Sequence, residues 1–415
     1  MVGSTEDRGH VLVVDNGAGW IKAERASADR PRCFPNAAIK SRAEAFTRYG
    51  EFSTSAKDVS GLTLRRPHER GYLNQIDLEK DIWSAVFRSK LKVDPKESGL
   101  LLTEPLLNLQ ACQSMTEQVV FEDFGFRSYY SCPAPLLAAR HHFSRNPKSD
   151  ACLAGAGLVL DLGFSFTHAV PIFDNRVVNY GIRRLDFGGK AATNLLKEVV
   201  SHRSMNVMSE PHMVEIIKEE ACFVSQDSAA DLRKAQSSRD AFTTEYVLPD
   251  GITVFRPHVR KAPDAQAAAM ERGPGAPKSR QGPQILRVAH ERFMVPEVYF
   301  HPSDVGLNQA GIAEIVVQSL EAIDPLLWPV LLSNVLVTGG SSMIPGLVER
   351  FRQELRKTCP IDCPLSVTHS QELAQTSAWH GGKVLVSSGE YRAMAVTRQE
   401  YMDHGCDPKR RKLLS

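Results

Sequence analysis

The sequence of 415 residues has little excess charge and no long hydrophobic run. Its apolar runs are far shorter than the roughly 18 residues that span a membrane, so no membrane-spanning helix is expected. The formal net charge is only +2, which is too small to predict nucleic-acid binding by the whole chain. The first ten residues, MVGSTEDRGH, have no apolar segment and no lipidation motif, so no signal peptide or anchor is expected.

Cysteine is scarce and scattered, with eight residues in the chain. Cys359 and Cys363 form a lone C-x-x-x-C without a second ligand pair, so a zinc site is not expected. Without a signal peptide, the thiols are predicted to be reduced, as in the cytosol or nucleus. The chain does have 42% hydrophobic and 24% charged residues, the balance of a soluble globular protein. Its length predicts two or more domains.

Three short apolar runs end in turns of small residues. VLVVD at 11–15 precedes NGAG, LVLD at 158–161 precedes LGFS, and VLVT at 335–338 precedes GGSS. Such runs predict buried strands of an α/β sheet. Since the runs are far apart in sequence, a site built from all three requires separate parts of the chain to meet.

Amphipathic helices are predicted between these strands. Residues 78–90 place four large side chains on one stripe, namely Ile82, Trp83, Val86 and Phe87. Similar patterns cover 111–121 and 346–356, and the second of these helices begins after Pro345.

The turns after the first two strands share the pattern D-x-G, at 15–17 and 161–163. Glycine lets backbone N–H groups approach phosphate oxygens, and an aspartate at a strand end can hold a divalent metal, usually through water. Lys22 can supply a positive charge to a phosphate, and the GGSS turn can present N–H groups to a nucleoside. Together the three turns predict a nucleotide cleft.

Six ordered segments resemble the actin family. DNGAGWIKA resembles its first phosphate loop, DLGFSFTHAVPIF its second, and VLVTGGSSMIPGLVERF its adenosine loop. LLTEPLLN, IIKEEACFVSQD and HERFMVPEVYFHPSDVG are also similar to actin-family segments, so the match covers about 11–400 with gaps. The resemblance implies an α/β protein with the actin-like ATPase fold, in which two RNase H-like domains flank a nucleotide cleft.

The resemblance also implies that the second domain is inserted within the first. After a lead-in at 1–10, the implied first domain comprises 11–160 and 377–415, with a small subdomain at 41–70. The implied second domain is 161–376, with a small subdomain at 196–284 that carries a basic insertion at 252–284.

The implied ligand is ATP or ADP with Mg²⁺, in a structural role. The metal would be held through water by Asp15 and Asp161. His168 is interpreted as a satisfied cleft histidine in preference to a working base. The residues that match the nucleotide-binding positions of the family are Asp15, Gly17, Gly19, Lys22, Asp161, Gly163, His168, Gly189, Lys218, Glu219, Gly339 and Gly340.

Departures from the family pattern predict weak or absent hydrolysis, and no catalytic residue is predicted. Ala18 stands where actin has a phosphate-binding serine, and it has no hydroxyl. Phe164 replaces an aspartate, and Ser165 replaces a glycine, in the second phosphate loop. The glutamine that orients water in actin aligns near Cys132, in SCPAP, where no side chain can do this.

Segments such as GYLNQIDLEKDIW resemble one nuclear branch of the family more closely than actin itself. The resemblance implies a non-catalytic scaffold subunit of a chromatin-remodelling complex that exchanges a histone variant into nucleosomes. The implied partners are a remodelling ATPase and a zinc-finger HIT-type subunit, with histones or the nucleosome contacted indirectly. The implied location is the nucleus, with some protein in the cytoplasm.

The insertion at 252–284 is rich in Pro, Gly, Arg and Lys, and we predict a partly disordered surface segment with a short helix around its alanines. It is either a solvated loop or a docking arm. Lys409–Lys412 resemble a nuclear-import patch. Two other functions remain open: a cytoskeletal filament-forming ATPase, against which the poorly matched 41–70 stretch argues, and a metabolite kinase, for which no acceptor pocket is evident.

Overall fold

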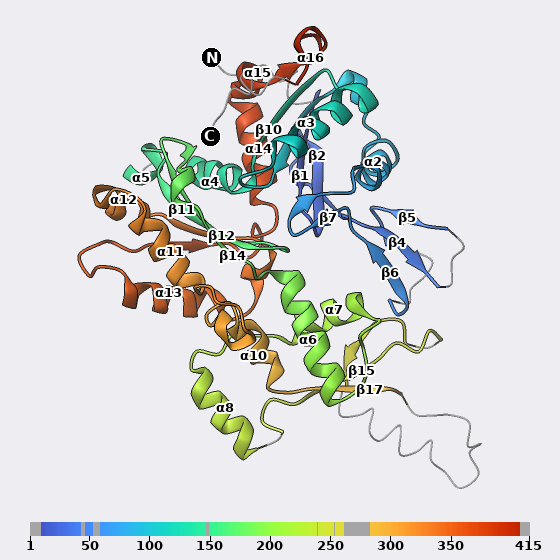
Figure 1. The fold of residues 1–415 in the computed structure, drawn as a ribbon, viewed down its shortest axis with the longest axis vertical. Helices are drawn as coiled ribbons and strands as arrows, with labels where there is room; N and C mark the ends of the chain where they lie inside the picture. The colour runs from blue at the N-terminus through green and yellow to red at the C-terminus, as the bar shows by residue number, and fades with distance from the viewer. Residues whose placement is uncertain are drawn as a thin grey trace.

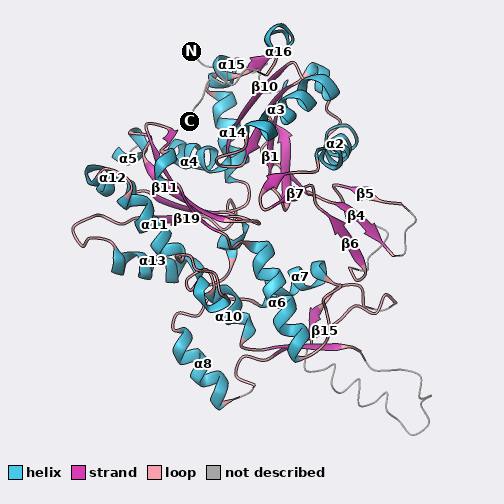
Figure 2. Cartoon of the chain, in the orientation of Figure 1, coloured by secondary structure: helices cyan, strands magenta, loops and turns pink. Residues whose placement is uncertain are grey.

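The computed structural model describes residues 10–42, 46–52, 59–146, 149–238, 240–252, 254–260 and 283–406. Two large mixed sheets, flanked by helices, form the body of the molecule (Figures 1 and 2). The strand order is β20-β10-β9-β1-β2-β3 in the first sheet and β13-β12-β11-β18-β19 in the second, where β14 also pairs with β12. This arrangement confirms the predicted α/β class.

The two sheets repeat one plan. In the first, β1 pairs antiparallel with β2 and parallel with β9; in the second, β11 pairs antiparallel with β12 and parallel with β18. The strands of the first sheet are β1 (Val11–Asn16), β2 (Trp20–Arg25), β3 (Arg32–Pro35), β9 (Gly99–Glu104), β10 (Ser128–Pro133) and β20 (Val396–Thr397). Those of the second are β11 (Gly157–Leu162), β12 (Thr167–Phe173), β13 (Arg176–Val177), β14 (Arg183–Leu185), β18 (Val335–Thr338) and β19 (Val367–His369).

The three predicted strands are confirmed as β1, β11 and β18. Their apolar residues are buried because helices cover the sheets, which explains continuous apolar runs in place of alternation. Each strand ends at the turn that the sequence analysis singled out, so the three turns lie at the carboxyl ends of central strands.

Two helices, α4 (Ala134–Arg145) and α14 (Ser377–Ser387), pack together where the chain passes between the sheets. Their close approach requires Gly381, because a Cβ there would lie 1.8 Å from the carbonyl oxygen of Leu137. The other α-helices are α2 (Ile76–Ser84), α3 (Gln110–Gln118), α5 (Asp150–Leu153), α6 (Gly189–Arg203), α7 (Pro211–Ala221), α8 (Ser228–Ser237), α10 (Glu291–Glu297), α11 (Ile312–Glu321), α12 (Trp328–Leu332), α13 (Leu347–Thr358), α15 (Glu390–Met394) and α16 (Arg398–His404).

The predicted helix at 78–90 is present, but it changes type along its length. It comprises α2 and a π-helical segment, Ala85–Lys90, and its apolar stripe is fully buried as predicted. The predicted helix at 111–121 likewise comprises α3 and a π-helical segment, Val119–Phe124. The third predicted helix is α13, which begins after Gly346, a glycine with a φ of +83°.

Two three-stranded sheets lie beyond the large ones. β5-β4-β6, with β5 (Arg48–Tyr49), β4 (Ala38–Ser41) and β6 (Leu62–Arg65), overlaps the predicted subdomain at 41–70. The second of these sheets, β16-β15-β17, comprises β15 (Thr244–Val247) and β17 (Ile285–Val288), which flank the insertion, and β16 (His258–Val259), which lies within its first part. A hairpin joins β7 (His68–Glu69) to β8 (Tyr72–Leu73). The exact domain boundaries stay predictions.

Two sequence predictions fall outside the described residues. These are the short helix around the alanines of the insertion and the basic patch Lys409–Lys412. All eight cysteines are described, and all are free thiols. No helix in the described part of the chain is both long and apolar enough to cross a membrane.

Candidate functional site

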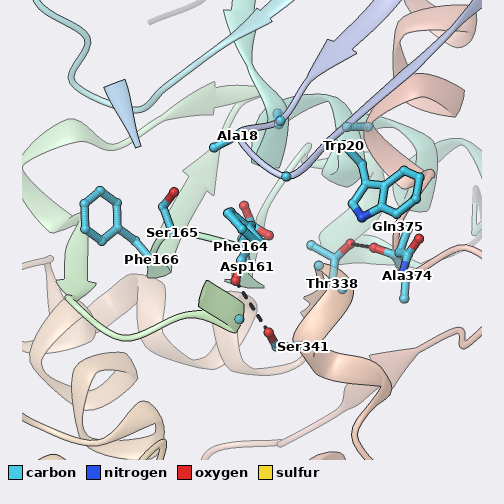
Figure 3. Close-up of a pocket in the computed structure, with 18 of the residues that line it drawn as sticks. Ala18, Trp20, Asp161, Phe164, Ser165, Phe166, Thr338, Ser341, Ala374 and Gln375 are labelled. Atoms are coloured by element: carbon cyan, nitrogen blue, oxygen red, sulfur yellow. Dashed lines mark hydrogen bonds between the residues drawn. The ribbon is translucent and has the colours of Figure 1, made fainter. Parts of the chain in front are cut away.

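A cavity of about 500 Å³ lies between the large sheets, at the carboxyl ends of β1, β11 and β18 (Figure 3). Ligands of α/β proteins commonly bind at this edge of a sheet. Every residue predicted to bind nucleotide lines this cavity, although the predictions come from segments up to 325 residues apart: Asp15, Gly17, Gly19, Lys22, Asp161, Gly163, His168, Gly189, Lys218, Glu219, Gly339 and Gly340. Their binding role itself stays a prediction.

The first loop, Gly17–Gly19, offers backbone donors to the cavity. None of these three backbone N–H groups donates a hydrogen bond to a described residue. Consecutive unpaired N–H groups favour an anion. Lys22 lies opposite Asp15 in the β1–β2 pairing, and its Nζ is 3.0 Å from a carboxylate oxygen of Asp15. The loop therefore combines free N–H donors with a lysine that is partly neutralised by its neighbour.

The carboxylates of Asp15 and Asp161 interact across the floor of the cavity. Burial, together with the charge of Asp15, raises the pKa of Asp161 to about 6, and Lys22 opposes this shift. Asp15 also accepts a 3.0 Å hydrogen bond from the Thr103 hydroxyl. The described residues contain no group of three His, Cys, Asp or Glu side chains arranged around a metal, so any metal would need water among its ligands.

The side chain of Phe164 lies between the two phosphate loops (Figure 3). A Cβ placed on Gly19 would be 2.9 Å from its ring, so the ring is in direct contact with the first loop. The guanidinium of Arg66 lies over the same ring, 4.6 Å from its centroid, and donates a 2.7 Å hydrogen bond to the Gly19 carbonyl. An aromatic ring thus bridges the loops where the family pattern places a carboxylate.

The second loop binds the start of α6 through its carbonyl groups. Gly189 N–H donates to the Gly163 carbonyl at 3.1 Å, and Lys190 N–H donates to the Phe164 carbonyl at 2.8 Å. The Gly163 N–H in turn donates to the Phe166 carbonyl at 2.9 Å. The first N–H groups of α6 are therefore used by the loop itself and do not provide an anion site.

Gly339 and Lys218 shape the side of the cavity that the family resemblance assigns to adenosine. Gly339 has a φ of +92°, and a Cβ there would lie 2.4 Å from the Leu162 carbonyl oxygen, so the turn after β18 tolerates only glycine. Lys218 Nζ donates to the Gly189 carbonyl at 3.1 Å and to the Thr193 hydroxyl at 3.0 Å. Burial raises the pKa of Glu219, an effect that Lys218 opposes.

His168 lines the cavity as a neutral imidazole. Burial and the nearby Arg184 lower its pKa to about 4, and Asp186 opposes this shift. Its ring lies edge-on to Phe166 at 5.9 Å. An imidazole with this pKa is uncharged at neutral pH, so one ring nitrogen can donate a hydrogen bond and the other can accept one.

The structure shows which residues of the SCPAP stretch, at the start of α4, face the cavity. Cys132 lies in β10, is only 2% exposed, and has a thiol pKa raised by burial, and it does not line the cavity. Ala134 and Pro135, two and three residues later in the same SCPAP stretch, line it instead. Neither side chain has an amide that could orient water.

Three residues at the site were not anticipated from the sequence. Thr103 follows the apolar run of β9, and the parallel pairing of β9 with β1 places Thr103 beside Asp15. The apolar run that precedes Thr103 was an available sequence signal. Arg66 comes from the stretch that matched the family poorly, and no sequence signal marked it. Glu79 is fully buried below the first loop, and its place three and four residues before Ile82 and Trp83, on the face of the apolar stripe, was an available signal.

Comparison with known proteins is consistent with this geometry. A family model described as actin matches residues 6–413. Actin-related protein 6 of Arabidopsis thaliana is 39% identical, over 97% of this chain and 99% of that protein. Proteins of the same name from Drosophila melanogaster and Neurospora crassa are 34% and 35% identical, each over 95% of this chain and over 97% and 92% of their own length. The chain therefore belongs to the actin family.

Proposed function

We propose that this protein is a nucleotide-binding scaffold with little or no ATP hydrolysis. The observation that carries the proposal is the Phe164 ring between the phosphate loops, where it contacts Gly19 and Arg66. Phosphoryl transfer depends on positioned groups and charge stabilisation. Ala18 lacks a hydroxyl, Phe164 lacks a carboxylate, and no side chain of the SCPAP stretch has an amide. Loss of the carboxylate and loss of the water-orienting amide are each expected to cost on the order of 10²-fold in rate.

The cavity still suits a nucleotide. The free N–H groups of Gly17–Gly19 and the Lys22 ammonium would contact phosphate, while the Gly339 turn, Lys218 and Glu219 would surround the nucleoside. Bound Mg²⁺ would supply positive charge to the phosphates through water held by Asp15 and Asp161. Since a ligand that binds only the folded state stabilises it, we propose a structural role for ATP or ADP.

Equilibrium binding of ADP and ATP, with a parallel turnover assay, tests this proposal. We expect Lys22→Ala to weaken ADP binding by about tenfold or more, because it removes the phosphate-facing charge. Lys357→Ala is the matched control, since Lys357 is exposed on α13 outside the cavity. ATP turnover that disappears in Asp161→Ala would contradict the non-hydrolytic assignment, and equal ADP binding by wild type and Lys22→Ala would contradict the phosphate site.

We further propose that the protein acts in the nucleus, with some in the cytoplasm, as a subunit of a chromatin-remodelling complex that exchanges a histone variant. This rests on the likeness to proteins named actin-related protein 6 and on the branch-specific segments of the sequence. The proposed partners are a remodelling ATPase and a zinc-finger HIT-type subunit, with histones contacted indirectly. The insertion at 252–284 is the first candidate docking surface.

Affinity purification from nuclear extract tests the scaffold proposal. We expect the remodelling ATPase and the zinc-finger HIT-type subunit to copurify, and a variant without residues 261–282 to lose them while keeping its unfolding temperature. Copurification by the deleted variant would remove the insertion from the interface. Sedimentation of the purified protein as filaments in magnesium would instead support a cytoskeletal role.

A further inference from the structure

A second cavity, of about 310 Å³, shares the wall residues Ala138, Thr338, Ala374 and Ser377 with the candidate nucleotide cavity. We call it the histidine pocket. Its charged and polar lining comes from the end of α4 and from β19 with the loop after it: His141, His142, Arg145, Asn146, Thr368 and Ser370. The cavity is of the size of the smaller ligand pockets of proteins.

The lining is one-sided in charge and contains no carboxylate. The Arg145 guanidinium and the His141 ring make no hydrogen bond or ion pair with another side chain or carbonyl in the described part of the chain. The hydroxyls of Thr368 and Ser370 are likewise without a described partner. A pocket lined by an exposed arginine, histidines and hydroxyls, and by no carboxylate, suits an anionic ligand.

His142 is already satisfied and forms a fixed wall. Its Nε2 is 2.7 Å from the Oδ1 of Asn334, whose amide nitrogen donates to the Ala156 carbonyl, so the imidazole must donate. Its Nδ1 then accepts from the Asn146 amide at 3.4 Å. The donors left for a ligand are therefore Arg145 and His141.

His141 stacks on His380 of α14, with ring centroids 5.1 Å apart. Burial, together with the neighbouring His380, Arg145 and His142, lowers the pKa of His141 to about 4. No carboxylate is among the groups that act on this ring. A bound anion would supply the missing negative charge.

His380, the stacking partner on α14, also has positively charged neighbours. Burial lowers the pKa of His380, and Lys383, Arg145 and Arg30 lower it further. The carboxylate nearest to Lys383 is that of Asp29, 3.7 Å from its Nζ and fully exposed. The histidine pair thus lies in positive surroundings from both helices.

We propose that the histidine pocket binds an oxyanion, a carboxylate or phosphate group of a small ligand or side chain, through Arg145 and His141. Leu373 would contact the apolar part of the ligand. Since an anion raises the pKa of an adjacent histidine, binding takes up a proton, and affinity rises as pH falls. The site does not depend on nucleotide in the neighbouring cavity.

Calorimetric titration of the full chain with sulfate tests the proposal, because the charge of sulfate is constant between pH 5 and 8. We expect binding about tenfold tighter at pH 5.5 than at pH 7.5, as the imidazole becomes charged. Arg145→Gln is expected to weaken binding about tenfold or more, while the exposed control Lys357→Gln leaves it unchanged. His141→Gln is expected to abolish the pH dependence, and proton NMR of the His141 ring should show its pKa rising when sulfate is added.

Sulfate could also bind the phosphate loops, and Lys22→Ala separates the two sites. Binding that survives Lys22→Ala and is lost in Arg145→Gln supports the histidine pocket. Binding that is lost in Lys22→Ala, or that Arg145→Gln leaves intact, overturns it. Succinate in a parallel titration identifies a carboxylate source if it binds and sulfate does not, and the absence of binding by both overturns the proposal. If Arg145→Gln unfolds, the His141→Gln titration decides alone.

Discussion

Glu79 is a fully buried carboxyl group beneath the first loop. One of its oxygens accepts hydrogen bonds from the side-chain amides of Asn16, at 2.7 Å, and Asn36, at 3.3 Å. Its other oxygen has no partner among the described residues. Burial raises the pKa of Glu79 to about 7, although these hydrogen bonds oppose the shift. The folded protein therefore binds a proton here that the unfolded chain releases near pH 4.5.

The pKa of Glu79 predicts a pH-dependent stability. Since the folded pKa is raised, the stabilising contribution is present at low pH and is lost as pH rises from 4.5 through 7. Between pH 5 and 8 we expect the free energy of unfolding to fall by about 2–3 kcal/mol from this group. Urea unfolding at both pH values should show that Glu79→Gln removes this difference.

The control for Glu79→Gln is Glu198→Gln, which neutralises an exposed carboxyl on α6. It should leave the pH dependence of unfolding as in wild type. Identical pH profiles of wild type and Glu79→Gln would show that Glu79 does not titrate in this range.

At the scale of single residues, the sequence supported the turn glycines and aspartates well, because short apolar runs followed by D-x-G are local patterns. Glu79 was missed although it lies three and four residues before Ile82 and Trp83, on the face of the apolar stripe. Its burial could be read from this spacing, but its partners Asn16 and Asn36 are 63 and 43 positions away, so those contacts depend on long-range folding. The Phe164 substitution was evident, but its contact with Arg66 depends on long-range folding.

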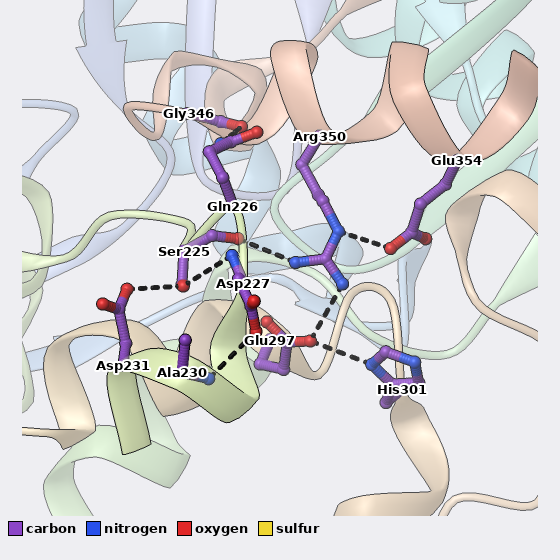
Figure 4. A network of polar contacts seen from close by, with 10 residues as sticks. All are labelled: Ser225, Gln226, Asp227, Ala230, Asp231, Glu297, His301, Gly346, Arg350 and Glu354. Atoms are coloured by element: carbon purple, nitrogen blue, oxygen red, sulfur yellow. Dashed lines mark hydrogen bonds and ion pairs between the residues drawn. The ribbon is translucent and has the colours of Figure 1, made fainter. Parts of the chain in front are cut away.

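At the scale of elements, Arg350 of α13 joins three segments (Figure 4). Its guanidinium donates to the Ser225 carbonyl at 2.8 Å and to Glu297 at 3.4 Å, and it pairs with Glu354 one turn along the helix. Glu297 is 2% exposed and also binds His301, at 2.9 Å. The network fixes the helix that follows the adenosine loop against α10.

Removing Arg350 leaves the buried Glu297 with only a histidine partner. We expect Arg350→Ala to lower the free energy of unfolding by about 3 kcal/mol, because an uncompensated buried charge is costly. Arg350→Lys should lose less, since it keeps the charge and loses only the fork of donors that reaches three different acceptors. Chemical denaturation measures both.

Arg352→Ala provides the comparison, since Arg352 is exposed on the same helix and makes one hydrogen bond, to the Val367 carbonyl. It is expected to change stability by less than about 1 kcal/mol. An equal loss in the Arg350 and Arg352 variants would contradict a special role for the network.

The helices themselves show where periodicity is informative and where it is not. The stripe Ile82, Trp83, Val86 and Phe87 correctly predicted which face is buried. It did not predict the change to π-helix at Ala85. A π-helix has more residues per turn than an α-helix, but over so short a segment both helix types place nearly the same side chains on the buried face.

At the scale of the whole molecule, contacts within the chain hold the mouth of the cleft closed. The Gly61 N–H donates to a Glu210 carboxylate oxygen at 2.7 Å, and the Phe52 ring stacks on His212 at 4.5 Å. Val59 N–H also donates to the Phe255 carbonyl at 3.0 Å. In Figure 1, β4 and β6 approach the α7 region. These contacts join the two sides of the cleft at its mouth.

Removing two of these contacts should open the cleft mouth. In the double variant Glu210→Ala with His212→Ala, we expect amide exchange across 59–66 to be about tenfold faster, since local opening sets exchange rates. Exchange in β1 and β11 should not change. Hydrogen exchange with mass spectrometry measures this, and wild-type rates in the double variant would show that the remaining contacts suffice.

The order of segments in the first sheet has a consequence for synthesis on the ribosome. Tyr391 bonds Ser128 and the Leu100 carbonyl, and Tyr401 stacks on Phe121, so the core around β9 and β10 is incomplete until these late residues emerge. The second sheet, by contrast, is contiguous from 157 to 369 and can pair its strands earlier. The nascent amino-terminal third therefore stays partly uncovered until residues 391–401 have emerged, and a chaperone would protect it most during that interval.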